Sequence, residues 1–148
     1  MKLPYAENIN YWKTSKSSPD TWLEKATKQI ELLGGTVYTH AFGKDDNGNS
    51  AYMMVFSIKG DKFKVVWPVL PTKSDNEAAA KRQATTLLYH DIKAKSLSAT
   101  VKGVREAFFQ YLTLPDGRTT TQASIDELMD GIPLSIAGYN VLQITNGE

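Results

Sequence analysis

Three extended segments separated by turn signals constrain this chain more than any other feature. The segments are rich in β-branched and aromatic residues and span 36–42, 51–58 and 62–69. A polar loop over 43–50 separates the first two, and Gly60 with Asp61 forms a Gly-X pair suited to a two-residue hairpin. Because strands joined by such short connections run antiparallel, the sequence predicts a three-stranded antiparallel β-meander over residues 36–69.

The third segment alternates between apolar and basic side chains. One face carries Phe63, Val65 and Trp67, and the other carries Lys62, Lys64 and Val66. This period of two is typical of a strand with one buried face, so the lysine face is expected to meet solvent or a ligand. Proline at position 68 has no N–H to donate, and it ends the strand.

A helix is predicted before the meander, after an arm over residues 1–17. Ser18, Pro19 and Asp20 form an N-terminal signal, with a capping hydroxyl, a proline in the first turn and an acid near the positive end of the helix dipole. The expected apolar stripe is Trp22, Ala26, Ile30 and Leu33. Two glycines at 34 and 35 end the helix.

A long helical segment over 76–112 is predicted after the meander, with two apolar stripes. The first is Ala80, Ala84, Leu87, Leu88 and Ile92, and the second is Leu97, Val101, Val104, Phe108, Tyr111 and Leu112. Their centres lie roughly 135° apart around a helix, so one straight helix cannot bury both against one surface. We therefore expect a break near Lys95 and Ser96, although a continuous helix in contact with two bodies gives the same pattern.

Two further features lie within this segment and after it. Asp91 and Lys95 lie on the apolar side four residues apart, which indicates either a partly buried ion pair or a narrower apolar side. A capping box over residues 124–127 predicts a short C-terminal helix that Gly131 and Pro133 close. The expected fold is a single α+β domain over 1–148: N-terminal helix, β-meander, broken helix pair and short C-terminal helix.

Composition excludes several classes of site. The chain has no cysteine, which removes disulfides, thiolate metal sites and cysteine nucleophiles. It has no apolar run of the length expected for a signal peptide or a membrane span. We therefore expect a soluble cytoplasmic protein without a membrane role.

Charge is distributed unevenly along the chain. Residues 59–105 hold ten Lys or Arg against four Asp or Glu, a net charge of +6. Residues 106–148 hold one Arg against six acids, a net charge of −5, so the segment over 114–148 is acidic. Such asymmetry favours a charged partner, and clustered lysines and arginines with an aromatic side chain are typical of nucleic-acid binding.

The candidate nucleic-acid-binding residues come from the third strand and the helix after it. They are Lys62, Lys64, Arg82, Tyr89, Lys93 and Lys95. If the lysine face of the strand adjoins the basic face of the helix, Lys62, Lys64, Arg82, Tyr89 and Lys93 line one groove, with Tyr89 placed to stack on a base. The alternative is an ordinary solvated helix face and protective lysines on an edge strand.

No pattern indicates catalysis, a metal or a cofactor. His40 and His90 stand in different elements without a neighbouring carboxylate cluster, and the loop at 45–49 departs from the calcium-binding pattern. No nucleophile motif or phosphate-binding glycine loop occurs. Trp67 can either expose its indole for stacking or belong to the core. We expect a protein that is not an enzyme and has no cofactor.

The order of helix, meander and basic helix resembles the core of the single-strand annealing proteins of phage and eukaryotic recombination. The residues that carry the resemblance are KGDK at 59–62 and EAAAKRQA at 77–84, within 36–95. The run over 63–112 also resembles small phage and mobile-element proteins. The resemblance implies an oligomeric protein that lays single-stranded DNA in a groove between hairpin and helix, without hydrolysis.

The functional expectation is therefore a non-enzymatic nucleic-acid-binding module, with single-stranded nucleic acid as partner and a homo-oligomeric state. The alternative is a phage or mobile-element interaction protein that binds another protein through the second apolar stripe or the apolar tail over 132–144.

Overall fold

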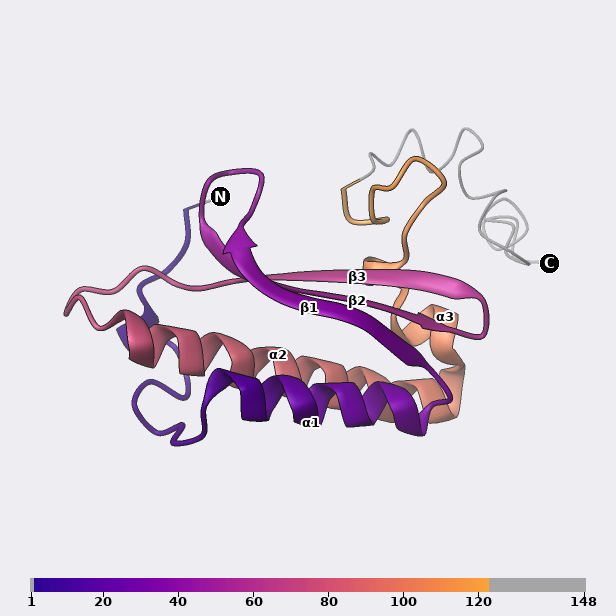
Figure 1. The fold of residues 1–148 in the computed structure, drawn as a ribbon, viewed down its shortest axis with the longest axis horizontal. Helices are drawn as coiled ribbons and strands as arrows, with labels where there is room; N and C mark the ends of the chain where they lie inside the picture. Colours follow the sequence, from indigo (N-terminus) through magenta and orange to yellow (C-terminus); the bar gives the residue numbers. More distant parts are fainter. Residues whose placement is uncertain (1, 123–148) are drawn as a thin grey trace.

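A three-stranded antiparallel sheet lies on two helices in the computed structural model, which describes residues 2–122 (Figure 1). The strands are β1 Thr36–Lys44, β2 Ser50–Ile58 and β3 Asp61–Pro68, in the spatial order β1-β2-β3. Helices α1 and α2 run side by side beneath the sheet (Figure 1). The predicted α+β class and the meander are confirmed.

The two turns of the meander are stabilised in different ways. In the β1–β2 loop the Asp45 carboxylate accepts hydrogen bonds from the N–H groups of Asn47 and Asn49, at 2.9 and 2.8 Å. The β2–β3 turn consists of Lys59 and Gly60, both with positive φ, at 52° and 88°. The expected Gly60-Asp61 turn is thus wrong by one residue, because Asp61 pairs with Ile58 and opens β3.

Helix α1, Pro19–Leu32, begins and ends where the sequence predicts. The Ser18 hydroxyl accepts a hydrogen bond from the N–H of Thr21 at 3.3 Å. Leu23, Ala26 and Ile30 are buried on its inner side.

Helix α2, Glu77–Lys102, is continuous through Lys95 and Ser96, so the break expected there is wrong. The helix ends seven residues later at Gly103, whose φ of 99° a glycine adopts without strain. The difference arises because the second stripe is not buried on α2: Leu97 and Val101 are exposed, and its buried aromatic residues follow Gly103.

The residues of the second apolar stripe are exposed on α2 and buried after it. Leu97 and Val101 are 71% and 82% exposed on α2. Phe108, Tyr111 and Leu112 are buried, but they follow the break, in and around the short helices α3 Val104–Ala107 and η2 Phe109–Tyr111. The chain therefore turns back at Gly103 and returns its aromatics to the core.

The core lies between the sheet and the helices. Its inner-face side chains from the sheet are Tyr52, Met54, Phe56 and Ile58 on β2 and Phe63 and Val65 on β3. Phe56 and Phe63 stack at a centroid distance of 5.3 Å, and Phe108 packs on both at 5.7 Å. These rings join the hairpin to the segment that follows α2.

Strand β1 is unlike the other two strands. Every one of its residues except Val37 is exposed, although it pairs with β2 along its length. A register shift between Val37 and Thr39 marks a β-bulge at its start. Its outer edge pairs with no other strand within residues 2–122.

The N-terminal arm is attached to α2 by a buried amide. Gln83 Nε2 lies 2.8, 3.1 and 3.1 Å from the carbonyl oxygens of Ala6, Ile9 and Asn10. The Glu7 carboxylate accepts hydrogen bonds from the N–H groups of Lys73 and Ser74 and from the Ser74 hydroxyl. The arm thus joins the start of α2 to the loop that precedes it.

The predicted helix after the capping box at 124–127 and the tail over 132–144 lie outside the described residues. Within residues 2–122, no helix combines the length and the hydrophobicity that a membrane span requires.

Gly35 is the position where the fold leaves no room for a side chain. A Cβ there would lie 2.7 Å from side-chain atoms of Ile30 and Ile58 and 2.8 Å from the carbonyl oxygen of Ser57. We expect Gly35→Ala to lower the free energy of unfolding by about 1–3 kcal/mol in urea denaturation. Gly43→Ala is the matched control, since a Cβ there meets nothing within 4 Å. Equal stability of the two variants would contradict the close packing at Gly35.

The carboxylate of Glu7 predicts a pH dependence of stability. Burial of the group raises its pKa, but the hydrogen bonds from Lys73 and Ser74 outweigh that effect and lower the pKa from 4.5 to about 2. A carboxylate whose pKa is lower in the folded state stabilises that state at pH values above the unfolded pKa. This contribution to stability is lost as the pH falls from about 4.5 to about 2. We expect Glu7→Gln to lower the melting temperature at neutral pH and the difference from wild type to shrink in acid. Glu24→Gln, at an exposed position of α1, is the control.

Candidate nucleic-acid interface

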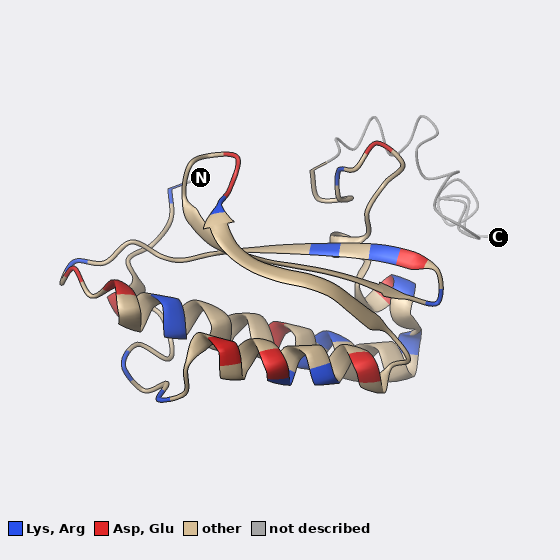
Figure 2. Ribbon diagram, in the orientation of Figure 1, with Lys and Arg blue, Asp and Glu red and all other residues tan. Residues whose placement is uncertain are grey.

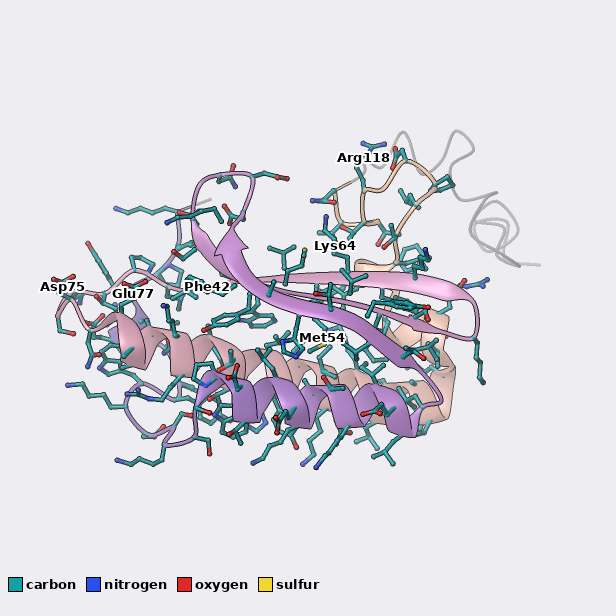
Figure 3. The ribbon with its side chains drawn as sticks, in the orientation of Figure 1. Phe42, Met54, Lys64, Asp75, Glu77 and Arg118 are labelled. Carbon is teal, nitrogen blue, oxygen red and sulfur yellow. The ribbon has the colours of Figure 1, made fainter. Side chains whose placement is uncertain are left out.

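Lys62 and Lys64 lie on the face of the sheet that points away from the helices, which we call the outer face. Figure 3 shows Met54 between sheet and helices and Lys64 on the opposite side of the sheet. The alternation predicted for β3 is therefore confirmed: Phe63 and Val65 are fully buried, Lys62 is exposed and Lys64 is half-buried. Burial of one face forces the two lysines to the other.

The outer face is organised in rows that cross the strands. Strand pairing places Ser57 opposite Lys62, and the Ser57 hydroxyl forms a 3.0 Å hydrogen bond with the phenol of Tyr38. Tyr38 is 60% exposed. An exposed aromatic ring and a lysine thus flank the same serine, an arrangement that can hold a base by stacking and a phosphate by charge.

The rest of the outer face is largely apolar. The remaining rows are Thr39, Val55 and Lys64, then Ala41, Met53 and Val66. Met53 and Val55 are half-buried, and Val66 is exposed. Helices α1 and α2 lie on the opposite side of the sheet (Figure 1), and the segment over 110–122 lies beside β3 at Lys64 and Val66.

The hairpin end of the molecule carries further positive charge. Figure 2 shows Lys and Arg residues on β3, at the β2–β3 turn and at the end of the helical layer next to it. One of these charges is neutralised, because Arg105 of α3 binds the Asp61 carboxylate with Nε at 2.9 Å and a second nitrogen at 3.0 Å. Lys59 in the turn is exposed. The positive potential of the outer face therefore extends around the hairpin.

Tyr89 and Lys93 lie on a different surface. The Tyr89 ring contacts Trp22 of α1 at a centroid distance of 5.4 Å, and Lys93 Nζ lies 6.0 Å from the centre of the Tyr89 ring. Tyr89 is half-buried among the rings that join α1, α2 and the arm, since Tyr11 also stacks on His90 at 5.0 Å. Tyr89 therefore has a structural contact with α1.

Lys95 forms an ion pair with Asp91, next to Tyr111. Its Nζ lies 2.8 Å from Asp91 Oδ1 and over the ring of Tyr111, and its side chain is 16% exposed. The Tyr111 hydroxyl donates a short hydrogen bond to the other Asp91 oxygen. Burial, together with this bond and the charge of Asp91, raises the pKa of Tyr111. Of the two interpretations of Asp91 and Lys95, the partly buried ion pair is the one observed.

The six predicted residues do not line one groove. Phe63 and Val65 are buried with Leu88 and Ile92 of α2, so the core separates the lysine face of β3 from α2. Arg82 is half-buried on α2 and Lys93 is exposed near α1. The sheet and helix surfaces do not adjoin because the sheet presents its apolar face, not its basic one, to α2. Whether any of the six binds nucleic acid stays a prediction.

Tyr38 is the residue that sequence analysis missed. Strict alternation along β1 places Tyr38 on the same face as His40 and Phe42. The bulge between Val37 and Thr39 inserts one residue and moves Tyr38 to the outer face. No sequence signal marks this bulge.

Metal-ligand geometry and the comparisons with known proteins add no candidate residues within the described part of the chain. Within residues 2–122, no three His, Asp or Glu side chains are arranged to hold a metal ion. Comparison with protein-family models, curated proteins and solved structures gave no match.

Proposed function

We propose that this protein is a non-enzymatic module that binds single-stranded nucleic acid on the outer face of its sheet. Lys62 and Lys64 neutralise backbone phosphates, and Tyr38 stacks on a base. The observation that supports this proposal is the joining of Tyr38, Ser57 and Lys62 in one row of an open sheet face.

A single strand suits this surface better than a duplex. In a duplex the base faces are already stacked on one another, so an exposed aromatic ring on a sheet gains little from them. In a single strand every base offers its face, and sequence-independent binding then combines stacking with phosphate contacts. Arg82 and Lys93 remain a second basic surface on the helical side, which a longer strand can reach only around the edge of the molecule.

An assembly role has its own support. Leu32 of α1 and Leu97 of α2 are 81% and 71% exposed and line one open groove of about 640 Å³ between the helices. Val101, one turn beyond Leu97, is also exposed. Exposed apolar side chains gathered in this way are typical of protein interfaces. We propose this groove as the contact between copies of the chain, in agreement with the expected homo-oligomer.

Salt dependence tests the nucleic-acid proposal. We expect the full chain to bind a labelled oligothymidylate at low salt and to lose affinity linearly in a plot of log K against log salt. Lys62→Gln and Lys64→Gln are each expected to lower the slope by about 0.7, because each removes one phosphate contact. Lys28→Gln, which removes an exposed charge from α1, should leave the slope unchanged. An absence of binding at low salt would contradict the proposal.

Light scattering tests the assembly proposal. We expect Leu97→Asp to shift the molar mass towards that of the monomer, because a charge in the groove is costly to bury against a second copy. Val66→Asp adds the same charge to the outer face and should leave the molar mass unchanged. A wild-type protein that is monomeric at every concentration measured would rule out this contact.

A further inference from the structure

A second cavity lies beside the outer edge of β3, between that strand, the N-terminal arm, α2 and the segment over 110–122. Its volume is about 480 Å³, within the range of small-molecule sites. Lys64 lines this cavity as well as the outer face. The cavity is therefore continuous with the surface proposed to bind phosphates.

The walls of the cavity combine a flat apolar side with polar groups. Trp67 and Leu87 supply apolar surface, and Gln110 and Gln122 supply amide groups. The Thr121 hydroxyl donates to the Gln110 carbonyl oxygen, and Gln122 Oε1 accepts from the Thr119 N–H, which orders this wall. Trp67 is half-buried: part of its indole packs on the core and part faces the cavity. The core and stacking interpretations of Trp67 are therefore compatible with each other.

The backbone of β3 adds hydrogen-bonding groups to this wall. Val69, just after β3, donates its backbone N–H to the carbonyl oxygen of Ser50 of β2. The backbone N–H and C=O groups of odd-numbered residues of β3 therefore point towards β2, and those of even-numbered residues point towards the open edge. Thr113 occupies the edge at Lys62, where its N–H donates to the carbonyl oxygen at 2.8 Å. The N–H and C=O of Val66 thus point towards the side on which the cavity lies.

We propose that this cavity takes one unpaired nucleobase of the strand that Lys62 and Lys64 bind. The inference rests on the proposed function. The indole gives a stacking surface, the backbone of Val66 and the glutamine amides give partners for the edge of the base, and Lys64 at the wall meets the attached phosphate. A base that is paired in a duplex cannot enter, so the cavity selects unpaired nucleotides.

The same edge offers little room for an extended peptide. Leu112 and Thr113 close it at Phe63 and Lys62, and Pro68 ends the strand. Residues 64–67 remain, which suffices for one planar ring but not for strand addition over the usual five or six residues.

The test compares two oligomers on the full wild-type chain, an oligothymidylate and an abasic oligomer with the same number of phosphates. Both carry the same charge, and only the first offers bases. Tyr38 on the outer face and Trp67 in the cavity each offer a stacking surface, so we expect the oligothymidylate to bind more tightly, with about 5- to 150-fold from each base that stacks on an aromatic side chain. Trp67→Leu should remove the share of one base with the salt slope unchanged, Tyr38→Leu should keep the share of the cavity, and Trp12→Leu, on the arm, should keep the whole difference.

The outcomes separate this inference from the proposed function. If both oligomers bind equally and Lys62→Gln still lowers the salt slope, the outer face binds phosphate and the base site is refuted. If Trp67→Leu keeps the full wild-type preference for bases while its melting curve shows a folded protein, no base is bound at the indole, and the inference fails. If neither oligomer binds at low salt, the proposed function fails first. If Trp67→Leu does not fold, Tyr38→Leu still tests the inference, because a preference for bases that disappears with the Tyr38 ring leaves none for the cavity.

Discussion

The stacking of Phe56 on Phe63, with Phe108 packed on both, is the interaction on which the rest of the structure depends. These rings fix which face of the β2–β3 hairpin meets the helices, because a shift of one residue in a strand exchanges its two faces. Lys62 and Lys64 point outwards as a direct result. Phe108 also returns the chain to the sheet after α2, and this return places the segment over 110–122 beside β3. The outer face and the cavity beside it are therefore both products of one aromatic contact.

A second constraint acts through buried polar groups. The amide of Gln83 binds carbonyl oxygens of the arm, and the Ser15 hydroxyl joins Thr86 of α2 to the indole of Trp22 of α1. Buried polar groups of this kind are costly unless they are satisfied, so they specify one position for the arm. Leu3 and Ile9 then form part of the cavity wall. Hydrogen bonds between buried polar groups thus fix the course of the arm.

Local signals predicted the elements, and non-local contacts decided how they meet. The N-cap of α1 and the alternation in β3 each depend on a few neighbouring residues, and each was found where expected. The break near Lys95 was wrong because the argument from the two stripes assumed that both are buried on one helix, whereas Leu97 and Val101 are exposed and the buried part of the second stripe follows Gly103. The single groove was wrong because the sequence does not show which face of the sheet α2 covers. Tyr38 was missed because a bulge inserts one residue without a sequence signal.

The exposure of β1 has a consequence for how stability is spread over the molecule. A strand that buries almost nothing adds little hydrophobic free energy, and its link to the fold consists mainly of its hydrogen bonds to β2 and its start after α1. Strands β2 and β3 pack on α2 and on Phe108, so we expect them to be more stable locally than β1, whose amides should open at lower free-energy cost. Tyr38 lies on β1, whereas Lys62 and Lys64 lie on β3. The outer face therefore combines an aromatic ring on a less stable strand with lysines on a more stable one.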